Sequence, residues 1–198
     1  MFQPTFYRTF RILPIVGLAA ALSACHSTRE YSHVPDYETA VDSVQGTSPA
    51  QAASQEEIWE KFGNMKAVFN DLKDPNLETH IRNAYAEELY FNDTFHTFDD
   101  RDQLIDYLLA TADRVKSTTT EFEEVGMSGS SYFLRWKMHI EVEVSGETIV
   151  TDSIGVSQIR FDESGKVVFH QDFWDNTEGF FRHLPVVGYV LDKTFERL

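Results

Sequence analysis

The feature that most constrains the fold is a long run in which apolar and polar side chains alternate. From Tyr132 to Val144 every even position is apolar, whereas the odd positions include charged side chains such as Arg135 and Glu143. Because successive side chains of a strand point to opposite faces of a sheet, this pattern predicts a long strand with one buried face. The rest of the chain must therefore supply an apolar layer that covers one face of an antiparallel sheet.

Further segments with the composition of strands lie before and after this run. We predict strands over residues 118–125, 149–161 and 167–174, and the last two are joined by a hairpin turn at Asp162–Gly165. Leu89–Phe91 is strand-like as well. The second half of the chain is therefore expected to be mostly antiparallel sheet.

Helical patterns dominate the chain before these strands. Ser54 and Glu57 form a capping-box pattern, which predicts a first helix that ends before Pro75. Two more helices are expected over residues 77–86 and from Asp99 or Asp100 to about residue 114. Helices followed by a run of long antiparallel strands predict the α+β class.

A last helix is expected after Asp175, with Phe180, Phe181 and Leu184 on its apolar side. Pro185 and Gly188 should break or kink this helix, because proline lacks a backbone N–H and glycine favours other conformations.

Residues 1–24 have the parts of a secretion signal. A basic start is followed by an apolar stretch, residues 12–22, and no acidic residue precedes Cys25. A bilayer-spanning helix needs about 20 apolar residues, so a cleaved signal is favoured over a membrane span. The sequence Leu22-Ser23-Ala24-Cys25 resembles the lipobox of bacterial lipoproteins, which implies that Cys25 is lipidated and becomes the first residue of the mature chain.

Two further observations concern this anchor. Cys25 is the only cysteine of the chain and so cannot form an internal disulfide. A plain signal peptide followed by an incidental free thiol is the alternative. His26 stands after the cysteine, and by resemblance to the sorting rule of Gram-negative lipoproteins this implies the cell envelope, at the outer membrane and facing the periplasm.

The mature chain is strongly acidic. The net charge is −15, and removal of Arg8 and Arg11 with the signal lowers it to −17. Such a surface repels nucleic acid, so no nucleic-acid partner is expected. Residues 25–54 are polar and lack an apolar period, which predicts a flexible tether that reaches at most roughly 100 Å, before a single domain over residues 55–198.

The order of these elements resembles the NTF2-like superfamily, and within it the SnoaL-like group. The segments that carry the resemblance are Tyr85–Asp93, Asp102–Leu108, Gly155–Asp162, Gly165–Asp175 and Leu184–Gly188. The resemblance implies an NTF2-like or cystatin-like cone, in which a strongly curved antiparallel sheet wraps around three helices and a C-terminal helix follows. It also implies that the cone holds a small apolar molecule, and that a homodimer is possible.

The richest polar cluster lies on the last predicted strand and contains His170, Asp172, Trp174 and Asp175. The resemblance implies that His170 and Asp175 are the catalytic candidates, as general acid or base. On a regular strand, however, odd and even positions face opposite ways. Apolar neighbours favour the odd face as the interior, which leaves Asp175 and Gln171 as pocket candidates, and a bulge would be needed to bring in His170. The position of Asp175 also suits an N-cap of the last helix, and this role is favoured over the catalytic one.

Other residues are weaker candidates for the binding site. Tyr90 and Trp136 are expected on the interior wall, where either can bond a ligand, although packing in the core is the commoner role. Asp93 could face the mouth of the cone, but Asn92-Asp93 is more simply a turn. The facing of Asp152 is left open.

No metal and no cofactor are expected. His139, His170 and Asp172 could hold zinc, but neither an HxxxH nor a CxxC spacing is present, so a solvated or dimer-facing surface is favoured for them. Three functions stay open: a lipid-anchored domain that binds a small hydrophobic molecule without strong catalysis, a SnoaL-like isomerase, cyclase or hydrolase that uses Asp175, and an envelope protein-interaction module.

Overall fold

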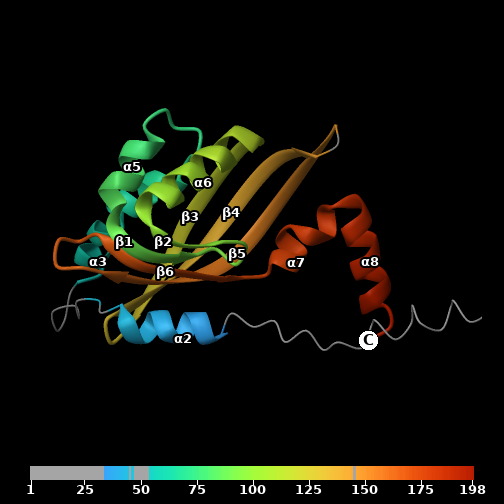
Figure 1. Cartoon of the computed structure of the whole chain (residues 1–198). Helices are drawn as coiled ribbons and strands as arrows, with labels where there is room; N and C mark the ends of the chain where they lie inside the picture. The colour runs from blue at the N-terminus through green and yellow to red at the C-terminus, as the bar shows by residue number, and fades with distance from the viewer. Residues whose placement is uncertain (1–33, 45, 47–53, 145) are drawn as a thin grey trace, which may run out of the picture. The chain divides into compact units, whose positions relative to one another are not determined.

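The computed structural model describes residues 34–44, 46, 54–144 and 146–198 (Figure 1). The chain forms two units, Met1–Pro35 and Asp36–Leu198. The predicted signal peptide, Cys25 and much of the predicted tether lie outside the described residues. None of the described helices is long and apolar enough to cross a membrane.

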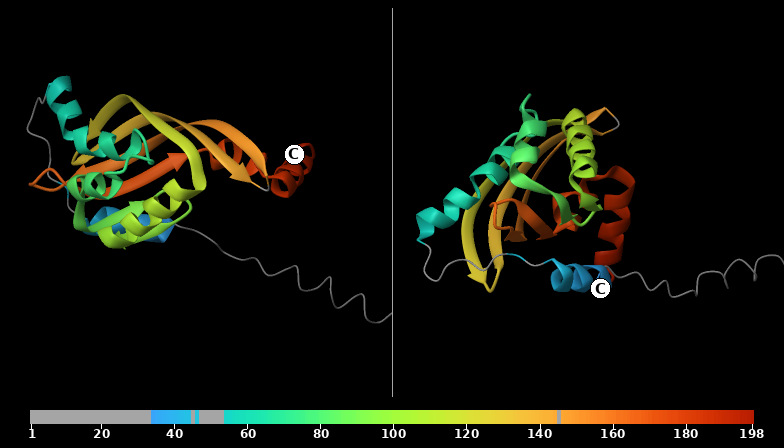
Figure 2. Two further views of the ribbon diagram at one scale, coloured as in Figure 1. Left: turned by 90° about the horizontal axis from the view of Figure 1, so that it is seen from above. Right: turned by 60° about the vertical axis from the view of Figure 1, so that its left-hand side comes forward.

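The domain is built on a six-stranded sheet in the order β2-β1-β6-β5-β4-β3. The strands are β1 (Tyr85–Asn92), β2 (Thr97–Asp100), β3 (Val115–Ser128), β4 (Ser131–Val144), β5 (Glu147–Phe161) and β6 (Val167–Trp174). All neighbours pair antiparallel except β1 and β6, which are parallel. The sheet is strongly curved (Figure 2), and the predicted α+β class and the predicted curved sheet are confirmed.

Helices fill the concave side of the sheet (Figure 1). They are α3 (Gln55–Lys61), α4 (Gly63–Phe69), α5 (Leu77–Ala84) and α6 (Arg101–Arg114). The predicted capping box at Ser54 is present, but the single first helix predicted from it is wrong because the helix divides at Phe62, before Gly63. Glycine is among the weakest helix formers, which accounts for a break at this point.

Large apolar side chains from the helices and from the inner face of the sheet form one core. Fully buried members include Phe62, Met65 and Ile81 from the helices and Tyr132 and Phe161 from the strands. The even positions of β4 point into this core as predicted, and Tyr132 and Leu134 are almost completely buried.

Strand β6 contains a β-bulge that reverses the facing of its side chains. Val167 and Phe169 lie opposite the adjacent residues Phe161 and Arg160 of β5, so Val168 is an extra residue in β6. Val167 therefore belongs to the core under the helices, whereas Phe169 belongs to a second cluster on the other side of the sheet. Beyond the bulge, even positions face inward and odd positions outward.

Helix α2 (Val34–Ser43) covers the outward side of β6 (Figure 1). Ala40 packs in a cluster with Tyr90 and Phe169. The Tyr37 hydroxyl donates a hydrogen bond of 2.8 Å to Oε1 of Gln158 in β5. The predicted flexible tether up to residue 54 is therefore wrong where α2 forms. The apolar stripe of this helix is short, and the polar residues around it hide it in the sequence.

An arginine fixes the end of α2 to the sheet. The Arg160 guanidinium donates hydrogen bonds of 2.7 Å to the carbonyl oxygens of Val41 and Val44, near the end of the helix. It also lies 5.3 Å from the centre of the Phe169 ring. The last carbonyl groups of a helix have no acceptor role within it, so the arginine supplies a donor at the point where the helix ends.

The chain after β6 forms α7 (Asn176–Gly179), a 3-10 helix η2 (Phe181–His183) and α8 (Pro185–Phe195). The last helix predicted after Asp175 is divided, and the predicted break at Pro185 is present, because Leu184 is extended and Pro185 begins a new helix. The break predicted at Gly188 is wrong, because Gly188 lies inside α8. Proline is well tolerated in the first turn of a helix. A Cβ at position 188 would lie 2.1 Å from the carbonyl oxygen of Arg182, so glycine is what lets α8 pack on η2.

Trp136 lies flat against a strand neighbour that has no side chain. Gly155 is directly opposite Trp136 in the β4–β5 pair. A Cβ on Gly155 would come within 2.2 Å of the Trp136 ring. The glycine therefore makes the space that holds the indole on the inner face of the sheet.

We expect Tyr37→Ala to lower the free energy of unfolding by about 1–3 kcal/mol, since it removes ring packing and leaves buried Gln158 without its donor. Urea unfolding measures this change. Glu38→Ala, an exposed position of the same helix, is the control and should change little. Equal effects of the two substitutions would show that α2 does not pack on the sheet in solution.

We also expect Gly155→Ala to destabilise the domain by about 1–3 kcal/mol, because the new methyl group forces the Trp136 indole to move. Thermal unfolding and near-ultraviolet circular dichroism report the stability and the indole environment. Gly126→Ala in β3 is the matched control, since a Cβ there would meet nothing within 4 Å. An unchanged indole signal in Gly155→Ala would contradict this account.

Candidate functional site

A histidine lies in the apolar core on the inner face of β6. Only 2% of His170 is exposed, and its ring is surrounded by the aromatic rings of Phe69, Tyr85 and Phe91. Its Nδ1 lies 2.7 Å from the Tyr85 hydroxyl. The bulge in β6 is what brings His170 to this face, so the regular-strand prediction that put the odd positions inside is wrong.

The other ring nitrogen of His170 contacts Asp172. His170 Nε2 lies 2.8 Å from Asp172 Oδ1, and the Ser157 hydroxyl donates a 2.5 Å hydrogen bond to the same oxygen. The Trp136 indole N–H in turn donates to Ser157 Oγ at 2.9 Å. A chain of hydrogen bonds therefore links five side chains of β1, β4, β5 and β6.

This network has one consistent set of donors. If the Tyr85 hydroxyl donates a hydrogen bond to Nδ1 of His170, the ring proton of His170 lies on Nε2. This N–H group then donates a hydrogen bond to Asp172. Trp136 donates to Ser157, and Ser157 donates to Asp172. The donors on both sides thus converge on Oδ1 of one carboxylate, which they hold in a fixed orientation.

The Asp172 carboxylate reaches solvent at the open end of this network. Its side chain is 15% exposed. Of its two carboxylate oxygens, only Oδ1 accepts hydrogen bonds from the described residues. Burial raises the pKa of the Tyr85 phenol well above its usual value, and the charge of Asp172 adds to the effect. Tyr85 therefore stays protonated as a donor, while Oδ2 of Asp172 is left for another partner.

A second polar pair lies near Asp172. The Tyr107 hydroxyl of α6 donates a short hydrogen bond to Oδ2 of Asp93, which follows β1. Burial, the charge of Asp93 and this bond raise the pKa of Tyr107, and Asp172 contributes to the same shift. Asp93 Oδ1 accepts from the backbone N–H groups of Phe95 and His96, so Asp93 is a turn residue as well as the partner of Tyr107.

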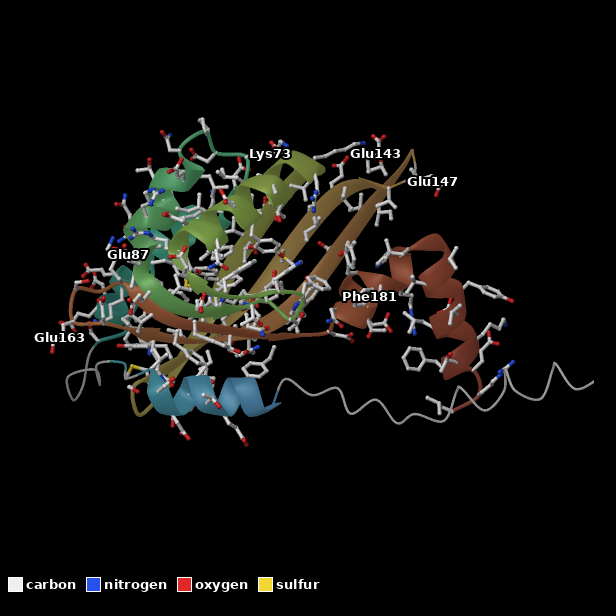
Figure 3. The ribbon with its side chains drawn as sticks, viewed as in Figure 1. Lys73, Glu87, Glu143, Glu147, Glu163 and Phe181 are labelled. Carbon is white, nitrogen blue, oxygen red and sulfur yellow. The ribbon has the colours of Figure 1, made fainter. Side chains whose placement is uncertain are left out.

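Aromatic side chains of the C-terminal segment adjoin this region. Phe95 packs on Trp174, Phe180 and Phe181 with ring centres 5.4–5.7 Å apart. The Trp174 indole donates a 3.0 Å hydrogen bond to the carbonyl oxygen of Asp93, and its ring adjoins that of Trp136. Figure 3 shows Phe181 at the end of the sheet, beside the start of the C-terminal helices. These rings border the polar groups with apolar surface.

The structure separates the residues predicted for the site. Trp136 lies on the inner face with His170. Tyr90 and Gln171 are hydrogen-bonded to each other at 3.0 Å on the outward side, under α2, so the prediction that places them on the interior wall is wrong. Asp175 is exposed and accepts from the N–H groups of Thr177 and Glu178, which makes it the N-cap of α7.

The outward side of β4 and β5 carries a separate ion pair. His139 Nδ1 lies 2.8 Å from Asp152 Oδ1, and the Asp152 side chain is exposed. His139 is thus on the opposite face of the sheet from His170. Within the described parts of the chain, no group of three or more His, Cys, Asp or Glu side chains is arranged to hold a metal ion.

Two hollows are visible on the surface of the domain. One of about 600 Å³ is lined by Val44, Glu88, Leu89, Asp99, Asp100 and Val168. The other, of about 510 Å³, lies beside His139 and Asp152 on the outer face. Neither of these two hollows is lined by His170 or Asp172, so it is the chemistry of the polar network that makes it a candidate site.

The sequence identifies only part of the network. His170 and Trp136 are predicted site residues, and Asp172 is named in the polar cluster and as a possible zinc ligand. Tyr85, Ser157 and the nearby Tyr107 are not predicted as site residues. The available signal was the mixed polar and apolar character of both faces of β6, which favours a strand buried on both sides. That signal does not reveal where the bulge lies.

No protein-family model and no curated protein matches the chain. Among solved structures, TsrD from Streptomyces laurentii has a TM-score of 0.54 at 12% identity, over 68% of this chain and 98% of that one. A candidate SnoaL-like polyketide cyclase from Shewanella denitrificans has a TM-score of 0.53 at 16% identity, over 63% and 94%. A phenazine biosynthesis-related protein from Pseudomonas aeruginosa has 0.53 at 12%, over 70% and 89%.

At these identities the likeness concerns the fold, and it agrees with the order and curvature of the strands. The chain has the NTF2-like fold in the form found in SnoaL-like proteins, as its sequence resemblance implied.

Proposed function

We propose that the protein is a lipid-anchored envelope domain that binds a small, largely apolar molecule beside Asp172 and uses this carboxylate as a general base. The observation that carries the proposal is the convergence of two donors on one oxygen of Asp172 while its other oxygen accepts no bond from the described residues. A carboxylate held in this way is preorganised to accept a proton from a bound molecule.

The surroundings of Asp172 suit proton abstraction. His170 and Ser157 fix the carboxylate, so little reorganisation accompanies proton transfer. The partly exposed indole of Trp174, which adjoins the buried ring of Trp136, offers apolar surface to a flat ligand. In the reaction, a C–H bond of the ligand breaks, Oδ2 takes the proton, and the electron pair stays on the ligand for a new double bond or a departing group.

The assignment of residue roles follows from contact. Asp172 is the catalytic base, since it is the member of the network that reaches solvent. His170 and Tyr85 are positioning residues, because burial keeps them from a ligand. Asp175 is not assigned a chemical role here, since its carboxylate caps α7.

The solved structures that share the fold support a small-molecule role. Their names denote a candidate polyketide cyclase, a phenazine biosynthesis-related protein and a candidate hydroxylase from Streptomyces galilaeus. Two of those names refer to polyketides and phenazines, which are small molecules. The shared fold is compatible with chemistry on small molecules. The reason to propose it for this chain is the hydrogen-bond network around Asp172.

An interaction module is the second candidate. The hollow beside His139 and Asp152 is open on the outer face, and the neighbouring side chains of Val150 and Ile154 are more than half exposed. Such a surface suits a protein partner or a second copy. It becomes the preferred function if Asp172 proves to have no reactivity.

The anchor predicts a defined chemical form of the N-terminus. In a Gram-negative host, we expect the mature chain to begin at Cys25 and to carry acyl chains there, which intact-mass measurement of the membrane fraction detects. Cys25→Ser should abolish acylation. A mature chain that begins elsewhere, or an unmodified thiol at Cys25, would refute the anchor without touching the Asp172 proposal.

The base can be tested without its natural substrate. 5-Nitrobenzisoxazole is a small flat compound that loses one proton to a base, after which its N–O bond breaks and a coloured phenolate forms. We expect the protein to accelerate this reaction, and Asp172→Asn to lose the acceleration by about 100-fold or more while it keeps its fold. Absorbance follows the product, and urea unfolding confirms stability.

Asp175→Asn is the matched control, since asparagine caps a helix as well as aspartate does. It should react at the rate of the unchanged protein. Equal rates for Asp172→Asn and the unchanged protein would refute Asp172 as the base. A loss that appears only in Asp175→Asn would return the catalytic role to that residue.

A further inference from the structure

Helix α8 exposes an unusual amount of apolar surface for a helix of a soluble domain. Val186 is 75% exposed and Val190 is 56% exposed. Val187, Tyr189 and Leu198 are exposed as well. Positions 186, 189 and 190 lie on one side of a helix, so these side chains form a continuous apolar face, here called the α8 face.

The opposite side of α8 is fastened to the domain. Arg182 of η2 lies 3.3 Å from the carboxylate of Asp192 and 5.2 Å from the centre of the Phe195 ring. Gly188 is buried against the backbone of Arg182. These contacts hold the helix by one side and leave the α8 face outward, so the exposure follows from how the helix is attached.

Two cations, Lys193 and Arg197, lie in and just after the end of α8 together with the acidic residue Glu196. Lys193 follows Val186 and Val190 at helical spacing and lies on the same side, whereas Arg197 stands in the turn after the helix ends. Lys193 also contacts Glu196 at 2.6 Å. In a mature chain of net charge −17, a face that combines exposed valines, a tyrosine and two cations differs from the rest of the surface.

This combination is the chemistry of a helix that lies in a membrane interface. Valine side chains enter the boundary between headgroups and acyl chains, tyrosine suits the headgroup level, and lysine and arginine pair with lipid phosphates. The acidic remainder of the domain is repelled by anionic headgroups, so it favours an approach by the α8 face.

We propose that α8 docks on the lipid surface to which the chain is anchored, with Val186, Tyr189 and Val190 in the interface and Lys193 and Arg197 at the phosphates. The inference rests on the lipid anchor proposed at Cys25. Residues 26–33 separate that cysteine from α2, and such a segment spans at most roughly 30 Å. The domain therefore stays close to the lipid, and a weak interfacial contact suffices to hold it.

A fluorescent label can report the contact. Acylation blocks the thiol of Cys25, so Val190→Cys places a single reactive thiol on the α8 face of the lipidated protein. Ile154→Cys is the matched control, because Ile154 is 57% exposed on β5. We expect a polarity-sensitive dye at position 190 to shift to shorter wavelength in vesicles of phosphatidylethanolamine with some phosphatidylglycerol, and the dye at position 154 to stay unchanged.

An unlabelled pair tests the same contact by affinity. In residues 26–198, which retain the whole second unit, Val186→Asp with Val190→Asp should lower partition into these vesicles roughly tenfold or more. Val150→Asp with Ile154→Asp alters two apolar positions of similar exposure and should not lower it. This version needs no acyl chain, so it separates a failure of the anchor from a failure of the α8 inference.

Two results would overturn the proposal. One is an identical dye response at positions 154 and 190, together with equal partition of the two aspartate variants. The other is a dimer in solution, measured by analytical ultracentrifugation, that Val186→Asp with Val190→Asp dissolves, because the α8 face would then belong to a second copy of the chain.

Discussion

The bulge in β6 is the constraint on which the candidate site depends. If β6 were a regular strand with Val167 in the core, Val168 and His170 would both point away from the core. With Val168 as an extra residue, His170 and Asp172 turn toward the helices, and Phe169 and Gln171 turn away from them. A single inserted residue therefore decides which polar groups meet inside the domain and which apolar ring must be covered from outside.

Both faces of β6 are consequently buried, and each requires its own cover. The inner face is covered by the helices of the main core, and the outer face by α2. Arg160 links β6 to its outer cover, because it stacks on Phe169 and donates hydrogen bonds to carbonyl groups at the end of α2. The segment that reads as a tether thus supplies a structural part of the domain, and the polar network on the inner side depends on the same strand.

Sequence patterns predicted the parts of the fold that follow regular periods. The alternation from Tyr132 to Val144, the cap at Ser54 and the hairpin at Asp162–Gly165 are strong local signals, and the structure contains each of them. The facing predicted for the side chains of β6 is wrong, because a bulge leaves no mark in a short strand whose two faces both mix polar and apolar residues. The predictions for Tyr90 and Gln171 failed with it, and Asp175 proved to be a cap for the same local reason that made it a capping candidate.

The cover that α2 provides also limits how two copies of the domain can meet. Domains with a curved sheet can pair by laying their outer faces together about a twofold axis. Here α2 occupies the outer face over β6 and adjoining strands, while β3 and β4 lie at the far edge of the sheet. A twofold axis through the middle of that face would drive α2 of one copy into its mate, so any pairing of outer faces must be offset toward the β3 edge.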